Sequence, residues 1–209
     1  MNHRRHLLFC FVLLFAVVCP LIAQEEENSK EPWDYKEFQA WSSEISAGIF
    51  APRTYPLNYY GVGWFPRYSL VAPKEYLAIS AGAPMHAGLD LVLTGNGNLI
   101  QYMIDVPLVI DFNFGARATD FDDTPFGVFI GGGLGYNFSH FTLGDTKLNI
   151  HTFGMLIHGG FRWRMNGRDS GVRIAFLSGF SGPAEEVNGI IVEDQPGNKI
   201  LSLTFLYGI

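Results

Sequence analysis

Four histidines follow the first 23 residues of the chain, and histidine is the residue type best suited to metal binding or proton transfer: His86, His140, His151 and His158. A zinc site needs several histidines, cysteines or carboxylates that converge on one point. His151 and His158 are seven residues apart in one alternating segment, so in a strand they would point to opposite faces. We therefore predict no metal site and no cofactor.

Two further motifs resemble catalytic or nucleotide-binding elements. Ser139 and His140 are adjacent, but neighbours on a strand point apart, so they cannot form a nucleophile–base pair. The run Gly131-Gly132-Gly133 followed by Gly135 is not followed by the Lys-Ser/Thr of a phosphate loop, and no helix pattern begins there. The sequence thus predicts no catalytic residue, and the protein is not expected to be an enzyme.

Charged side chains do lie on the small-residue faces of several alternating segments. If these faces enclose a lumen, the charges must pair, because an unpaired buried charge is strongly destabilising. In a soluble protein the same residues would be surface charges. The predicted lumen network consists of Asp105, Asp111, His158, Arg162, Arg164 and Arg173, with Arg162 or Arg173 expected beside Asp111.

The N-terminal part of the chain has a composition distinct from the rest. Residues 1–23 combine basic Arg4 and Arg5 with an apolar run, which predicts a secretory signal peptide that is cleaved after Ala23. Both cysteines lie inside it, so the exported chain has no disulfide. Residues 24–43 are acidic and predict a flexible segment; the alternative is a plug that packs its aromatic residues on the barrel mouth. With a net charge of −6, we expect no nucleic-acid partner.

Residues 44–209 show alternating apolar and polar positions, the period of a β-strand, and residues 100–116 give the clearest case. Turn residues separate eight such segments without a convincing amphipathic helix, which predicts an all-β, eight-stranded antiparallel up-and-down transmembrane β-barrel. Pro107 predicts a bulge in its strand. The segments are 44–51, 58–68, 75–83 (reaching 91 if the strand continues through Pro84), 100–116, 126–138, 148–164, 171–180 and 199–209.

The size of the side chains on the two faces indicates which face meets lipid. One face carries large apolar residues, while the other carries glycine, alanine and serine with a few charges. Because eight strands enclose room for little more than small side chains, the bulky face is expected outside, in lipid. A soluble lipocalin-like barrel is the alternative. The residues predicted to face lipid are Ile104, Leu108, Ile110, Phe112, Met155, Ile157, Phe161 and Phe205.

Three strand motifs carry a family resemblance: Tyr102-x-x-x-Val106-Pro107-Leu108, Phe112-Asn113-Phe114-Gly115, and Phe126-Gly127 continuing to Gly135-Tyr136. Together they resemble the small outer-membrane β-barrel domain family of Gram-negative bacteria, the PorT-like group, which is similar in architecture to the OmpX and OmpW type. The resemblance covers residues 44–209. It implies a porin-like membrane protein of the cell outer membrane that contacts outer-membrane lipid and, during insertion, the barrel-assembly machinery.

The motifs that carry this resemblance are strand patterns and not catalytic signatures, so they say little about activity. We expect a non-enzymatic integral outer-membrane protein with a structural, adhesive or accessory role. One alternative is a narrow pore or a transporter of small hydrophobic ligands, although inward-facing Phe129 and Leu156 oppose a polar channel. Another alternative is an outer-membrane lipid-modifying enzyme.

Overall fold

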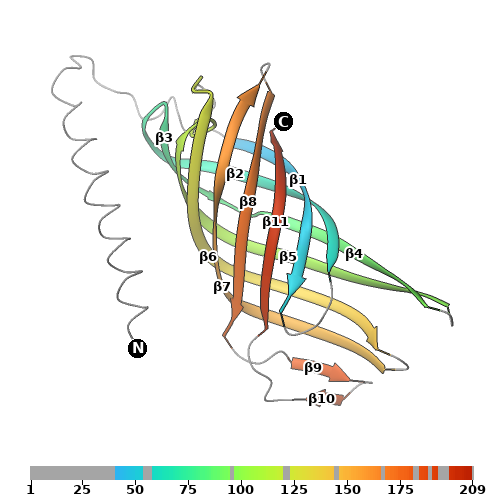
Figure 1. Ribbon diagram of the computed structural model, residues 1–209. Coiled ribbons are helices and arrows are strands. Elements are labelled where there is room, and N and C mark those ends of the chain that lie inside the picture. Colours follow the sequence, from blue (N-terminus) through green and yellow to red (C-terminus); the bar gives the residue numbers. More distant parts are fainter. Residues whose placement is uncertain are drawn as a thin grey trace, which may run out of the picture. The chain divides into compact units, whose positions relative to one another are not determined.

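The computed structural model describes residues 41–53, 58–94, 97–119, 123–143, 146–165, 168–180, 184–187, 190–192 and 198–208. The predicted signal peptide, residues 1–23, and residues 24–40 lie outside this range, as does Ile209. The described residues form strands joined by turns (Figure 1). The strands are β1 (Trp41–Pro52), β2 (Tyr59–Lys74), β3 (Leu77–Gly82), β4 (Met85–Thr94), β5 (Gly97–Gly115), β6 (Phe126–Leu143), β7 (Thr146–Met165), β8 (Arg168–Gly179), β9 (Ala184–Val187), β10 (Ile190–Val192) and β11 (Lys199–Gly208). No helix among the described residues is long and apolar enough to cross a membrane.

The sheet closes on itself. Strands β1 and β2 pair antiparallel, β3 and β4 each pair with both β2 and β5, and the pairing continues through β6, β7 and β8. Strand β8 then pairs with β11, and β11 pairs with β1 from Glu44↔Gly208 to Pro52↔Ile200. With β3 and β4 counted as one interrupted strand, the ring has eight members, and the predicted up-and-down barrel is confirmed. Closure leaves no unpaired edge within the ring, which is how such sheets avoid aggregation. Strand β1 begins at Trp41, so the end of the segment predicted to be flexible, residues 41–43, is strand.

The third strand is interrupted where two prolines face each other. Gly82 pairs with Val109 and His86 pairs with Asp105, so the register is the same on both sides of Ala83 and Pro84. Pro107 lies opposite this gap, and on its other side it pairs with Gly135 without a register shift. The predicted bulge at Pro107 is therefore wrong. The partner strand leaves the ladder instead, because neither proline has an N–H to donate.

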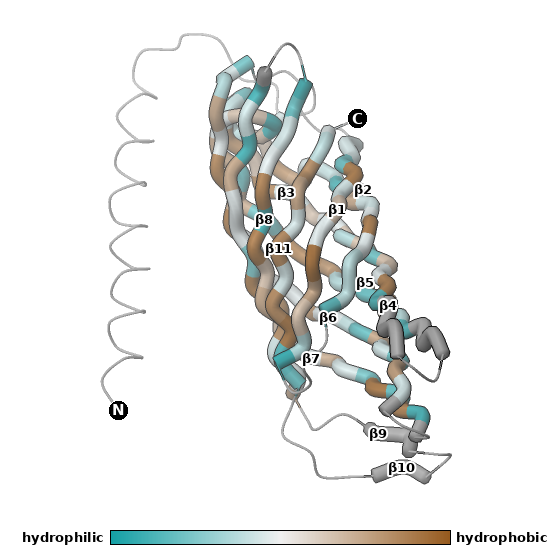
Figure 2. The backbone as a smooth tube through the Cα atoms, turned by 45° about the vertical axis from the view of Figure 1, so that its right-hand side comes forward, coloured by the Kyte–Doolittle hydropathy of each residue, from teal (hydrophilic) through white to brown (hydrophobic). Residues whose placement is uncertain are grey.

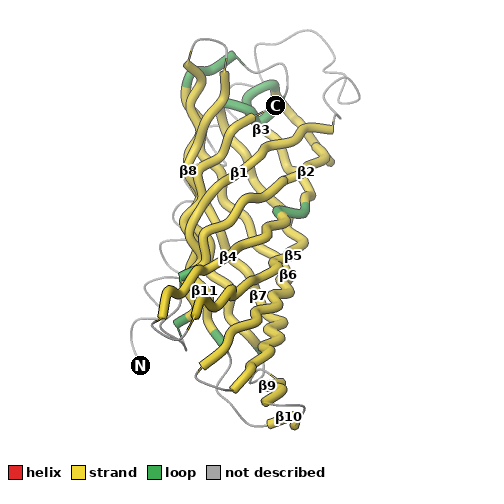
Figure 3. Tube along the Cα trace, turned by 90° about the vertical axis from the view of Figure 1, so that its right-hand side faces the viewer, coloured by secondary structure: helices red, strands yellow, loops and turns green. Residues whose placement is uncertain are grey.

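The barrel has two ends. We call the end where β1 begins and β11 finishes the terminal rim, and the opposite end the loop rim (Figure 3). At the loop rim, β7 continues to Thr146, beyond the end of its pairing with β8 at Gly154. Strand β9 pairs with this extension from Leu148 to His151, and β10 pairs with β9. The sheet therefore extends past part of the ring at the loop rim.

The alternation of β5 shows how the two faces are built. Its even-numbered residues from Tyr102 to Phe114 are exposed, whereas its odd-numbered residues are buried. Hydrophobic and hydrophilic positions alternate along the other ring strands as well (Figure 2). Exposed large apolar residues surround the barrel on all ring strands, whereas the buried residues are a mixture of apolar and polar types. A belt of this kind is stable in lipid and not in water.

Candidate functional site

A carboxylate–guanidinium pair crosses the lumen near the terminal rim. Arg162 on β7 donates from Nε to Glu44 Oε1 at 2.6 Å and from Nη2 to Glu44 Oε2 at 3.1 Å. Glu44 lies on β1, which is separated from β7 in the ring by β8 and β11. Both side chains are buried, and the Arg162 guanidinium also lies 4.0 Å from the centre of the Phe129 ring. This two-point pairing fixes both groups and blocks the space between opposite walls.

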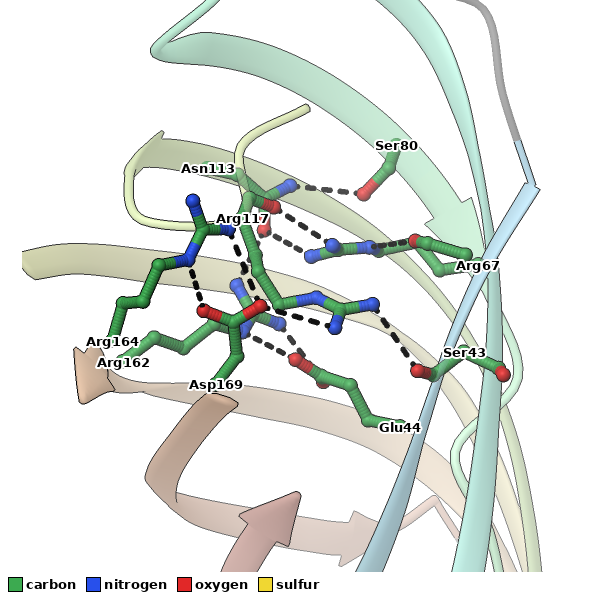
Figure 4. Close-up of polar contacts among 10 residues, drawn as sticks. Ser43, Glu44, Arg67, Ser80, Asn113, Arg117, Arg162, Arg164 and Asp169 are labelled. Carbon is green, nitrogen blue, oxygen red and sulfur yellow. Dashed lines mark hydrogen bonds and ion pairs between the residues drawn. The ribbon is translucent and has the colours of Figure 1, made fainter. Parts of the chain in front are cut away.

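Asn113 on β5 joins this pair to a second arginine (Figure 4). Its Oδ1 accepts from Arg162 Nη1 and from Arg67 Nη1, each at 2.9 Å, and its Nδ2 donates to Ser80 Oγ at 2.9 Å. Arg67 Nε donates to Ser42 Oγ at 3.2 Å. The Asn113 amide thus bonds side chains of β2, β3 and β7, and the two arginines extend the contacts to Ser42 and Glu44 on β1. This end of the lumen is therefore closed by a continuous hydrogen-bonded layer.

The connection after β5 folds into the mouth of the barrel. Gly115 has φ +70°, a conformation that glycine adopts without strain, and it turns the chain inward so that residues 115–119 are buried. The strand therefore ends at Gly115 and does not continue to Ala116 as predicted. The Arg117 carbonyl accepts from Arg67 Nη2 at 2.8 Å, and Thr119 Oγ1 donates to the Glu75 carbonyl at 2.6 Å. We call residues 115–119 the mouth turn.

Asp169, at the start of β8, accepts hydrogen bonds from two arginines at the terminal rim (Figure 4). It accepts from Arg164 Nε at 2.7 Å and from Arg117 Nη1 at 3.4 Å. Arg164 also donates to the exposed Asp123 at 3.0 Å, and Arg117 donates to the Ser43 carbonyl at 3.2 Å. Arg164, predicted in the lumen network, thus lies at the rim with a partly exposed side chain. Its position near the end of β7 explains this, because the wall ends there.

A second polar layer lies deeper in the lumen. Arg173 on β8 donates from Nη2 to His86 Nε2 at 2.7 Å and from Nε to Thr204 Oγ1 at 3.2 Å. Because arginine only donates, His86 Nε2 must accept, and the ring proton lies on Nδ1. This Nδ1 lies 3.6 Å from Asp105 Oδ2. Arg173 and Asp105, both predicted for the network, are thus connected through a histidine that the prediction did not include.

Asp111 and His158 form a third buried pair. His158 Nε2 lies 2.8 Å from Asp111 Oδ1, although Asp111 is on β5 and His158 on β7. Both residues pair in register with Gly131 on the strand between them, which has no side chain in the way. The ion-pair partner of Asp111 is therefore His158, and not Arg162 or Arg173 as the sequence suggested, because Arg162 is held by Glu44.

The absence of a side chain at Gly131 is expected to be necessary for this pair. A Cβ at position 131 would collide with Asp111 Oδ1 and lie 2.7 Å from His158 Nε2. Gly131→Ala should therefore lower the free energy of unfolding by about 1–3 kcal/mol, as overpacking of an interior does. Gly132→Ala is the matched control, because its Cβ would point outward with no atom closer than 3.1 Å. Urea titrations in lipid vesicles measure both; equal losses would contradict this account.

The eight residues predicted to face lipid all lie on the outer wall, with exposed fractions between 46% and 67%. Phe129 and Leu156 point inward and are buried. Ser139 Oγ donates to Asn137 Oδ1 at 2.8 Å on the inner side, and His140 lies within 2.6 Å of Asn149 on the next strand. Among the described residues, no three histidines, aspartates or glutamates converge as metal ligands.

Sequence reasoning missed six members of the site: Glu44, Arg67, His86, Asn113, Arg117 and Asp169. Glu44 carried the clearest signal, because it begins the same inward series as Ser46 and Phe50 on an alternating strand. Arg117 carried none, because it follows the end of the alternating pattern and reaches the lumen through the mouth turn. Four of the missed residues accept hydrogen bonds from arginines, and the other two are arginines themselves.

Comparisons with known proteins agree with this architecture. No family model and no curated protein sequence matches the chain. Among solved structures, the chain is similar to Neisserial surface protein A, with a TM-score of 0.50 at 9% identity over 81% of this chain and 94% of that one. It is also similar to the N-terminal β-barrel domain of OprF from Pseudomonas aeruginosa, with a TM-score of 0.50 at 12% identity over 80% and 97%. At identities this low, the likeness concerns the fold alone.

The apolar belt and the closed ring of eight strands indicate where in the cell the protein is located. A barrel whose outer wall exposes large apolar residues on every ring strand is stable in a bilayer. The chain has the fold of a Gram-negative outer-membrane β-barrel, and its belt places it in the cell outer membrane.

Proposed function

We propose that this protein is a non-enzymatic outer-membrane barrel with a closed lumen and a structural, adhesive or accessory role. The observation that carries the proposal is the layer formed by Glu44, Arg162, Asn113 and Arg67, which connects opposite walls just inside the terminal rim. The mouth turn lies beside this layer and is bonded to it through Arg67. A transported solute would have to break these contacts, so the closed lumen supports a role on the surface of the barrel.

The strand motifs around Pro107 support a place in the PorT-like group, with the OmpX- and OmpW-type architecture. The orientation follows the usual arrangement of such barrels, with both termini on the periplasmic side. The extended sheet at the loop rim, where β9 pairs with β7, would then face outside the cell. Backbone that projects beyond the membrane is available to other molecules, which favours an adhesive or accessory role over a purely structural one.

The closed lumen predicts that the protein does not conduct ions. Purified protein in planar bilayers should show no steady conductance above that of the bilayer alone, because side chains fill an eight-stranded lumen. The double variant Arg67→Ala/Arg162→Ala removes two of the side chains that close the terminal end. It should still show no steady conductance, because the Arg173–His86 layer and the inward Phe129 and Leu156 fill the lumen deeper in. A large steady conductance from the unmodified protein would support the narrow-pore alternative and contradict this proposal.

A further inference from the structure

A pocket lies at the terminal rim beside the start of β1. It has a volume of about 560 Å³ and is lined by Trp41, Ser42, Ser43, Trp64, Pro66, Arg117, Arg164 and Asp169. The pocket combines two guanidinium groups with two tryptophan rings, of which Trp41 is 72% exposed. We call it the rim pocket. Its composition matches the boundary between lipid and water, where tryptophan is enriched.

An apolar groove on the outer wall adjoins the rim pocket. The groove has a volume of about 620 Å³ and shares Trp41 and Pro66 with the rim pocket. Small residues from two parts of the wall form its floor. They are residues 81–83, beside the interruption of the third strand, and residues 132–133 on β6. The exposed side chains of Leu108, Ile110 and Leu134 also line it. We call it the wall groove.

The arginines of the rim pocket are arranged to bind an anion. Asp169 accepts from both Arg117 and Arg164, which places the two guanidinium groups side by side (Figure 4). Arg117 is more than nine-tenths buried, and its Nε has no hydrogen-bond partner among the described residues. Arg164 donates to Asp123, whose side chain is fully exposed, and such surface pairs exchange readily. Guanidinium groups of this kind bind phosphate oxygens in pairs.

We propose that the rim pocket and the wall groove together bind one anionic glycerophospholipid of the periplasmic leaflet. Its phosphate contacts Arg117 and Arg164, its glycerol region lies against Trp41 and Pro66, and one acyl chain follows the wall groove. The two halves of the ligand match the two halves of the site, one charged and one apolar. A free phosphate would use the rim pocket alone and leave the apolar groove unexplained. This inference rests on the membrane orientation given under the proposed function.

Native mass spectrometry of the purified protein tests the assignment. The full-length protein, released from detergent micelles that contain equal amounts of phosphatidylglycerol and phosphatidylethanolamine, should retain one phosphatidylglycerol molecule. Arg117→Gln/Arg164→Gln should reduce that retention about tenfold or more, the effect of losing charge-assisted hydrogen bonds. Arg53→Gln/Lys199→Gln at the opposite rim also removes two cations, so it is the matched charge control and should retain the lipid. Heat-modifiable gel mobility confirms that each variant is folded.

A substitution on the outer wall tests the wall groove separately from the arginines. Ala81→Leu fills the wall groove and should also weaken retention, whereas Ala47→Leu, on the outer face of β1 outside the groove, should not.

Equal retention of the two lipids, or full retention by the double arginine variant, would overturn the proposal. Competition by glycerol phosphate at the same concentration as the lipid would assign the rim pocket to a free anion. A protein dimer in place of the lipid-bound monomer would assign the groove to a second copy. Neither result would affect the test of the closed lumen, which is conductance.

Discussion

Glu44→Ala is expected to lower the free energy of unfolding in lipid vesicles by about 3–5 kcal/mol. The substitution leaves the buried guanidinium of Arg162 without its carboxylate, and its remaining neighbours Asn113 and Phe129 are neutral, so they provide no replacement charge. The loss exceeds that of a surface ion pair because Arg162 cannot recover hydration without opening the barrel. Reversible urea titration followed by tryptophan fluorescence measures it.

Ser46→Ala is the matched control for this prediction. Ser46 is the next inward residue on β1 and is buried, but its Oγ has no hydrogen-bond partner among the described residues. Its removal should therefore change stability by less than about 1 kcal/mol. Adding Arg162→Met to Glu44→Ala should recover part of the loss, because the unpaired charge is then gone. If Glu44→Ala behaves like Ser46→Ala, the lumen near Glu44 is wet and the pair does not stabilise the fold.

Ile110→Arg is expected to destabilise the barrel by about 2–4 kcal/mol. Ile110 lies on the outer wall with an exposed fraction of 53%, in the middle part of the belt on β5. An arginine there must either enter hydrocarbon or bend along the wall to reach the lipid headgroups. The same urea titration measures the change, and folded protein in the membrane fraction shows that insertion still occurs.

Phe114→Arg is the control for the depth of the substituted residue in the membrane. Phe114 is exposed to the same degree as Ile110, but it is the outward residue next to Gly115, where β5 ends at the terminal rim. The cost there should fall to about 0–1 kcal/mol, because the guanidinium reaches the headgroups. Equal costs at the two positions would show that the outer wall of β5 is not in contact with a bilayer, as expected for a soluble barrel.

The closed lumen and the proposed lipid site have a common origin in the mouth turn. Arg117 has φ +61°, an uncommon conformation for a residue with a side chain, and its side chain and carbonyl are both bonded. Gly208 allows this arrangement, because a Cβ there would meet the Arg117 guanidinium. A single residue thus both completes the layer that closes the lumen and contributes a cation to the rim pocket.

The period-two alternation of the sequence determined the strands and their faces. Successive side chains of a strand point to opposite sides whatever the partner strand is, so local spacing was enough to place Ile110 outside and Asp111 inside. The eight members of the ring followed in the same way, from turn residues between alternating segments, whereas the short strands β9 and β10 were not predicted. For β5 the predicted alternation was wrong beyond Gly115, where a positive φ ends it, and the predicted bulge at Pro107 was also wrong.

Only the tertiary structure decided which inward side chains meet. Glu44 and Arg162 are 118 residues apart in the sequence. Their contact depends on closure of the ring and on the stagger of its strands, and the local spacing of residues predicts neither. The pairing of Asp111 with His158 across Gly131 depends on the register of three strands at once. Likewise, the effect of Pro107 depends on Pro84 lying opposite it, because a gap in the partner strand removes the need for a bulge.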